Sequence, residues 1–252
     1  MQHIGQEELF DKFYKEGRIY KSVSREKIDL LGTTEYNPIS GETNIFVGDF
    51  KYDIQTMKVL AHEFGHAYDF SKFNESVEDW NVYFHQSFYN EVFSRLFERL
   101  LLEYLINNDI LKDEAKYKLY RFNDINQDYL LGSYILSLLP DEYLLANAFQ
   151  YDNRRQIFKK VKDNFSDEDS IKKFILEGER LNLKEDLTYA YGDIISMFLK
   201  IQIDNYGFDN DLVEEIMKFR SSMFDAKVFE KYNFGPNRYK KLHRQEFKLI
   251  KK

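Results

Sequence analysis

Cysteine is absent from the 252-residue chain, and proline (3 residues) and glycine (11 residues) are scarce. The absence of cysteine excludes a disulfide framework. Few prolines and glycines favour long helices over turn-rich β structure. No stretch approaches the about 18 consecutive apolar residues of a membrane span, and residues 1–8 lack a charged-then-apolar signal pattern. We therefore expect a cytoplasmic protein that does not bind membranes.

The charge balance is acidic, with a net charge of −7 and a pI of about 5.4. This argues against general binding to nucleic acid or to a membrane surface. Hydrophobic residues make up 43% of the chain and aromatic residues 17%, which is enough for a substantial core. The oligomeric state does not follow from these numbers.

The most informative segment is His62-Glu63-Phe64-Gly65-His66, which has the form His-Glu-x-x-His. Residues four apart on an α-helix are separated by roughly 40° around its axis, so both imidazoles can hold one metal ion. Zinc lowers the pKa of a bound water toward about 7. Glu63 lies beside the two histidines and can take a proton from such a water, so we predict a zinc site with Glu63 as general base.

A helix is expected around this motif, from about Asp53 to Phe70. Apolar residues recur there at steps of three and four, which is typical of an amphipathic helix; they are Ile54, Met57, Leu60, Ala61, Phe64 and Ala67. Gly65 costs about 1 kcal/mol relative to alanine inside a helix. Its presence therefore indicates close packing or close approach of another segment.

A catalytic zinc usually has three protein ligands and one open position. The metzincin extension requires Gly at 69 and His at 72, and Asp69 and Lys72 exclude it. The downstream candidates for the third ligand are Asp69, Glu75, Glu78, His85, Glu91, Glu98 and Glu103. Of these, Asp69, Glu75 and Glu78 are expected to face solvent at the helix end, and a second helix is expected from Glu78 to Asn107.

Two segments resemble the thimet oligopeptidase and oligoendopeptidase F family of zinc peptidases. The first is Thr56-Met57-Lys58-Val59-Leu60-Ala61-His62-Glu63-Phe64-Gly65-His66-Ala67, and the second is Glu91-Val92-Phe93-Ser94-Arg95-Leu96-Phe97-Glu98. The resemblance covers the catalytic part of the family only. It implies that Glu91 is the third zinc ligand and that Glu98 orients a ligating imidazole.

The segment Thr188-Tyr189-Ala190-Tyr191-Gly192-Asp193 resembles the tyrosine-rich substrate segment of the same family. By that resemblance Tyr189 and Tyr191 donate to the oxyanion of the reaction; a simple packing role is the alternative. The chain departs from the family in having Asp69 where a histidine is usual and no histidine in residues 167–188. The run His62-Glu63-Phe64-Gly65-His66-Ala67-Tyr68-Asp69 also resembles the zinc domain of anthrax-lethal-factor-like peptidases, in which Asp follows at that position and the glutamate ligand lies further along the chain.

The expected fold is mainly α, a zincin-like helical catalytic domain with a small N-terminal β-sheet. Residues 1–110 would form the metal-binding part, and residues 111–252 a helical part that completes the cleft, within one continuous catalytic domain. A helix is expected at 6–16, and short strands at 28–31 and 44–47 around a turn at 36–41. The later helices are expected at 111–121, 127–139, 141–163, 167–181, 185–206, 209–222, 225–232 and 236–250.

These features favour a zinc-dependent endopeptidase that hydrolyses short peptides. The alternatives are a zinc protease dedicated to one protein target, a catalytically silent regulatory zinc module, and a structural domain without metal. The presence of Glu63 argues against a catalytically silent site, since a structural zinc site needs no general base and has a fourth protein ligand in place of the open position. A strand just before the motif helix could pair with an extended substrate backbone, and residues 44–47 are the predicted edge.

Overall fold

The computed structural model describes residues 7–21, 31–37, 39–48, 51, 53–76, 90–123, 183–218, 248, 250 and 251. The chain divides into two units, one of residues 1–121 with 191–252 and the other of residues 122–190. The helices expected at 127–139, 141–163, 167–181 and 225–232 lie outside the described residues, as does most of 236–250.

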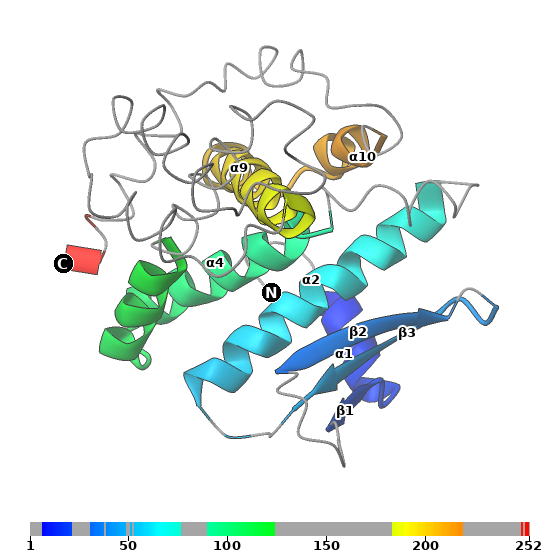
Figure 1. Cartoon of the computed structure of the whole chain (residues 1–252), viewed down its shortest axis with the longest axis horizontal. Coiled ribbons are helices and arrows are strands. Elements are labelled where there is room, and N and C mark those ends of the chain that lie inside the picture. Colours follow the sequence, from blue (N-terminus) through cyan, green and yellow to red (C-terminus); the bar gives the residue numbers. More distant parts are fainter. Residues whose placement is uncertain are drawn as a thin grey trace, which may run out of the picture. The chain divides into compact units, whose positions relative to one another are not determined.

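A three-stranded sheet lies near the N-terminus in the order β1-β3-β2 (Figure 1). Strand β3 (Glu42–Val47) pairs in parallel with β1 (Ile19–Lys21) and antiparallel with β2 (Gly32–Asn37). Thr43, Ile45 and Val47 are buried while their neighbours are not, the period of two typical of a half-buried strand.

Part of the strand prediction is wrong. Residues 44–47 belong to a strand as expected, but β3 is the central strand of the sheet and not an edge. Strand β2 begins at Gly32, just after the range expected for a strand at 28–31, and it includes Tyr36 and Asn37, where a turn was expected. Leu31 is not in a strand, and residues 28–30 lie outside the described part. Thr33, Thr34 and Glu35 carry no apolar alternation, so the pattern gave no reason to place a strand there.

Helices make up most of the described residues, which confirms a mainly α chain with a small sheet. Helices α1 (Glu7–Lys15), α2 (Ile54–Ser76), α9 (Leu183–Tyr206) and α10 (Asn210–Lys218) match expected helices, and another spans residues 112–123. Helix α4 (Val92–Asn107) lies within the helix expected from Glu78 to Asn107, but Asn90 and Glu91 form a turn before it, and residues 78–89 lie outside the described part. Among the described residues, no helix combines the length and apolar character that crossing a membrane requires.

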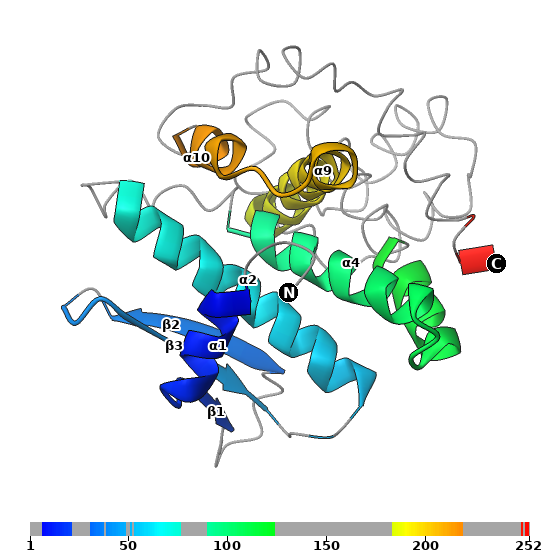
Figure 2. The ribbon, with the colours of Figure 1, turned by 180° about the vertical axis from the view of Figure 1, so that it is seen from behind.

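Phe64 of α2 lies at the centre of the core and is fully buried. It meets Phe10 and Phe13 of α1 edge-on, with ring centroids 5.2 and 6.2 Å apart, and stacks on Phe97 of α4 at 5.5 Å. Figure 2 shows α1 beside the middle of α2. One aromatic side chain of α2, the helix of the two histidines, thus contacts both the N-terminal helix and α4, the helix that follows Glu91.

Helix α9 is tied to α4 by two ion pairs of buried or mostly buried groups. Arg99 Nη2 donates to Asp193 Oδ1 at 2.8 Å, and neither side chain is exposed at all. Lys200 Nζ lies 3.0 Å from a carboxylate oxygen of Glu103 and 2.6 Å from one of Asp204. Burial acts to lower the pKa of Lys200, but the two carboxylates outweigh it and raise the pKa. These contacts hold residues 193–204 against the helix that follows Glu91.

Candidate metal centre

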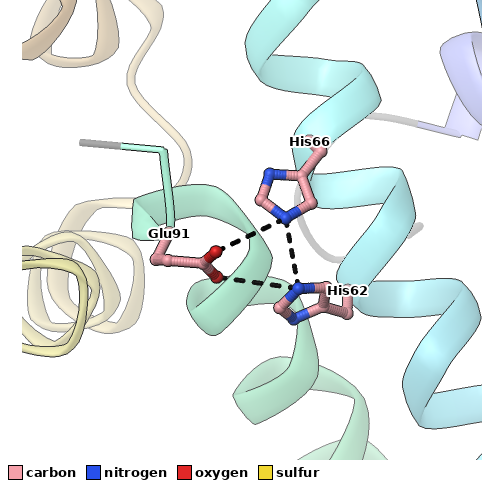
Figure 3. A group of neighbouring side chains, drawn as sticks. All are labelled: His62, His66 and Glu91. Atoms are coloured by element: carbon pink, nitrogen blue, oxygen red, sulfur yellow. Dashed lines mark hydrogen bonds and ion pairs between the residues drawn. The ribbon is translucent and has the colours of Figure 1, made fainter. Parts of the chain in front are cut away.

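The two motif histidines project from one face of α2. Asp53 precedes the helix and accepts a hydrogen bond from the main-chain N–H of Thr56 at 2.8 Å, as an N-capping residue does. His62 and His66 lie one turn apart, and their Nε2 atoms are 3.1 Å from each other. Figure 3 shows both rings pointing to the same side, toward Glu91. The geometry is the one that the four-residue spacing predicts.

Gly65 allows the start of α4 to approach α2 closely, as the sequence predicted. A Cβ atom at this position would lie 2.4 Å from the main-chain N and Cα of Ser94 and 2.5 Å from the carbonyl carbon of Phe93. No side chain can occupy that space without separating the helices. The glycine therefore sets how near the first turn of α4 comes to the two histidines.

Glu91 completes the cluster from the turn just before α4, and not from within a helix as predicted. Its carboxylate oxygens lie 3.6 Å from His62 Nε2 and 3.8 Å from His66 Nε2. The Ser94 hydroxyl is 2.8 Å from Glu91 Oε2 and 3.0 Å from the Glu91 main-chain oxygen. The Glu91 side chain is only 12% exposed, so its direction is restricted by the packing around it.

These three residues fit the donor set of a catalytic zinc site. Their ligand atoms all lie within 4.8 Å of one another, and the three closest separations are 3.1, 3.6 and 3.8 Å. In a tetrahedral site with bonds of about 2.0–2.1 Å, neighbouring donors are roughly 3.3–3.4 Å apart. The observed separations bracket that value. In such a site two imidazoles and one carboxylate would leave a fourth position for water or substrate.

Glu98 fixes the orientation of His62. Its Oε1 lies 2.6 Å from His62 Nδ1, which leaves Nε2 for the cluster, and its Oε2 lies 2.8 Å from Lys58 Nζ. Burial acts to raise the pKa of Glu98, but Lys58 and His62 hold it at about 2. Burial likewise acts to lower the pKa of His62, and Glu98, with Glu91 and Glu63, raises it. An ionised carboxylate on the outer nitrogen of an imidazole is the usual support of a metal ligand.

Glu63 points toward the sheet and meets β2. The Thr34 hydroxyl is 2.8 Å from both Glu63 Oε2 and the Glu63 main-chain oxygen. A Cβ atom at Gly32 would lie 2.9 Å from Glu63 Oε1 and 2.6 Å from Val59 Cγ1, so the carboxylate fills the space beside this glycine. Glu63 is 6% exposed, and burial raises its pKa. A carboxylate that holds a proton more readily is suited to acid–base chemistry.

The other predicted ligands do not join the cluster or lie outside the described residues. Asp69 is fully buried in α2 and not exposed as predicted, because the helix continues to Ser76. Glu103 pairs with Lys200. Glu78 and His85 lie outside the described residues, and the side chain of Glu75 is not described.

The two predicted tyrosines lie on α9. Tyr189 is half-buried and belongs to the unit of residues 122–190, and the side chain of Tyr191 is not described. Their contact with substrate stays a prediction. The next residue, Gly192, reaches the cluster: a Cβ atom there would lie 2.7 Å from Glu91 Cβ and 3.0 Å from the Glu91 carbonyl carbon. The start of α4 is therefore packed between α2 and α9.

Sequence reasoning missed four contacts of the site. They are those of Thr34 and Gly32 with Glu63, of Lys58 with Glu98, and of Gly192 with Glu91. None follows a local spacing rule, since each joins elements distant in the chain. Comparison of the chain with protein-family models, with curated proteins and with solved structures gives no match.

Proposed function

We propose that this protein is a zinc-dependent endopeptidase that hydrolyses short peptides. The observation that carries the proposal is the convergence of His62, His66 and Glu91, with the buried carboxylate of Glu63 on the same helix turn. This set supplies three ligands, an open position and a general base, which is the composition of a hydrolytic zinc site and not of a closed structural one.

Zinc at this cluster would polarise the scissile carbonyl and make a water molecule more acidic. His62 and His66 would bind through Nε2 and Glu91 through its carboxylate. Glu63 would take a proton from the attacking water and transfer it to the leaving nitrogen as the C–N bond breaks. Tyr189 and Tyr191 are proposed to donate hydrogen bonds to the oxygen on which negative charge develops.

An extended substrate would lie along β2. Within the described residues no strand pairs with the outer edge of β2, and this strand contacts the general base through Thr34. Hydrogen bonds from a strand edge recognise the peptide backbone and not its side chains. This arrangement favours cleavage that tolerates many sequences, in keeping with a peptidase acting on short peptides.

The proposal includes a zincin-like fold and kinship with the thimet oligopeptidase and oligoendopeptidase F family. The motif and Glu91 of the resemblance come together in space, which supports this kinship. We also propose a cytoplasmic location. Disulfides are rare in the reducing cytoplasm, and this chain, which has no cysteine, needs none.

The test is zinc content together with cleavage of a mixed peptide library, for the wild type beside Glu63→Gln. We expect one zinc per chain in both proteins and cleavage by the wild type only, because glutamine has nearly the same shape but cannot take the proton. Zinc without any cleavage would instead favour a protease with one dedicated protein target or a regulatory module. A wild type without zinc would refute the site itself.

A further inference from the structure

We propose that Thr34 is the positioning residue for Glu63, so that the strand along which substrate binds also holds the general base in place. This inference rests on the proposed function. It starts from the Thr34 hydroxyl, whose oxygen lies 2.8 Å from Glu63 Oε2 and 2.8 Å from the Glu63 main-chain oxygen, so that its one proton is shared between two acceptors of the same residue. Among the described residues Thr34 is the one hydrogen-bond donor to that carboxylate, and Gly32 provides the space in which its other oxygen lies.

Alternation along β2 places these contacts on one face of the strand. Gly32 and Thr34 are two residues apart and both meet Glu63, and Tyr36, two further on, stacks on Phe70 of α2 with ring centroids 5.4 Å apart. Side chains two apart on a strand point to the same side. The face of β2 toward α2 therefore packs along the helix from Glu63 to Phe70.

The main-chain N–H and C=O groups of Gly32 and Thr34 point toward the outer edge of β2. The N–H of Ile45 donates to Arg18 O on the β1 side at 2.9 Å, and Ile45 lies opposite Thr34 in the antiparallel pair. Thr34 is thus at a position where the two strands exchange no hydrogen bonds, and its own N–H and C=O point away from β3. Leu31 O accepts from Gly48 N at 2.9 Å, and by alternation Gly32 also points outward.

These two directions give Thr34 a double role. A peptide that adds to the outer edge of β2 would bond to the main chain of Gly32 and Thr34. On the face toward α2, the Thr34 hydroxyl contacts the Glu63 carboxylate, and the missing side chain of Gly32 leaves the space that this carboxylate fills. A substrate that holds β2 in place therefore also holds the Glu63 carboxylate in place. Because Glu63 is only 6% exposed, water cannot readily replace the hydroxyl of Thr34, and the carboxylate would turn toward another partner if it were lost.

The test compares Thr34→Val, which keeps the shape but removes the hydroxyl, with Thr34→Ser, which keeps the hydroxyl. We expect kcat of the valine variant to fall about tenfold to a hundredfold, the loss typical of a hydrogen bond to a charged group. We expect KM and zinc affinity to stay within about twofold, and the serine variant to recover most of kcat. Thr33→Val is the matched control, because its side chain lies on the opposite face of the same strand.

A second measurement does not depend on activity. The carboxyl ¹³C resonance of Glu63, assigned with Glu63→Gln, is followed in metal-free protein. It should move in Thr34→Val and in Gly32→Ala, and stay close to the wild-type position in Thr34→Ser and Thr33→Val. Gly32→Ala should move it because the added methyl group would lie 2.9 Å from Glu63 Oε1.

The outcomes separate the two proposals. If the wild type cleaves peptides and Glu63→Gln does not, while Thr34→Val keeps the wild-type kcat and resonance, the role of Thr34 is refuted and the peptidase stands. A loss of kcat in Thr34→Val that serine does not restore also refutes it, since the hydroxyl would then not be what matters. A wild type with no zinc-dependent hydrolysis overturns both.

Discussion

Replacing Glu98 by alanine should weaken zinc binding while leaving the three ligands in place. The Glu98 side chain is 3% exposed, its pKa is held at about 2, and it bonds to His62 Nδ1 at 2.6 Å. It is therefore an ionised partner of a ligating imidazole. Loss of such partners typically lowers metal affinity about tenfold to a hundredfold, equivalent to roughly 1.4–2.7 kcal/mol.

The affinity would be measured by competition with a zinc-binding dye at pH 7, with the free energy of unfolding of the metal-free protein measured in parallel. Glu98→Gln should fall between wild type and Glu98→Ala, because the amide oxygen can still accept from Nδ1 but carries no charge. Glu103→Ala is the matched control on the same helix: it breaks an ion pair with Lys200 away from the cluster and should keep wild-type affinity. Wild-type zinc affinity in a folded Glu98→Ala protein would refute the orienting role.

Three further changes test the packing around the site. Gly65→Ala should separate α2 from α4, because its Cβ would lie 2.4 Å from Ser94 main-chain atoms; zinc affinity and urea stability should both fall. Asp193→Ala should lower the free energy of unfolding by about 3–5 kcal/mol, since it leaves the fully buried Arg99 charge without this partner. The raised pKa of Lys200 contributes stability that is complete below its ordinary pKa of 10.5 and lost as pH rises through the folded value. The urea midpoint should therefore decrease more between pH 9 and pH 11.5 in the wild type than in Lys200→Met. An equal decrease in the two proteins would contradict this.

The parts of the site that were predictable are those set by local spacing. The common direction of His62 and His66 follows from the helical repeat, and the close approach at Gly65 follows from the cost of glycine inside a helix. Glu91 was one of several carboxylates that spacing alone could not separate, and only the resemblance selected it. Its proximity to the histidines depends on how α2 and α4 pack, and the spacing of apolar residues does not predict that packing.

The errors have physical reasons of the same kind. Asp69 was placed at the surface because apolar periodicity ends near Phe70, whereas α2 continues to Ser76 and buries it. The turn at Glu91 was missed because no glycine or proline marks it. The edge strand was assigned to the more apolar segment 44–47, and that apolar character belongs instead to the central strand, which is covered on one face and paired on both sides.

The central claim is that His62, His66 and Glu91 hold one zinc ion with an open position. X-ray absorption spectroscopy of the zinc-loaded protein tests it most directly, for the wild type beside Glu91→Ala and His66→Ala. We expect four nitrogen or oxygen donors with two imidazoles in the wild type, one imidazole fewer in His66→Ala, and weaker binding with both imidazoles kept in Glu91→Ala. Zinc with the same coordination and affinity in all three proteins, or no bound zinc in the wild type, would contradict it.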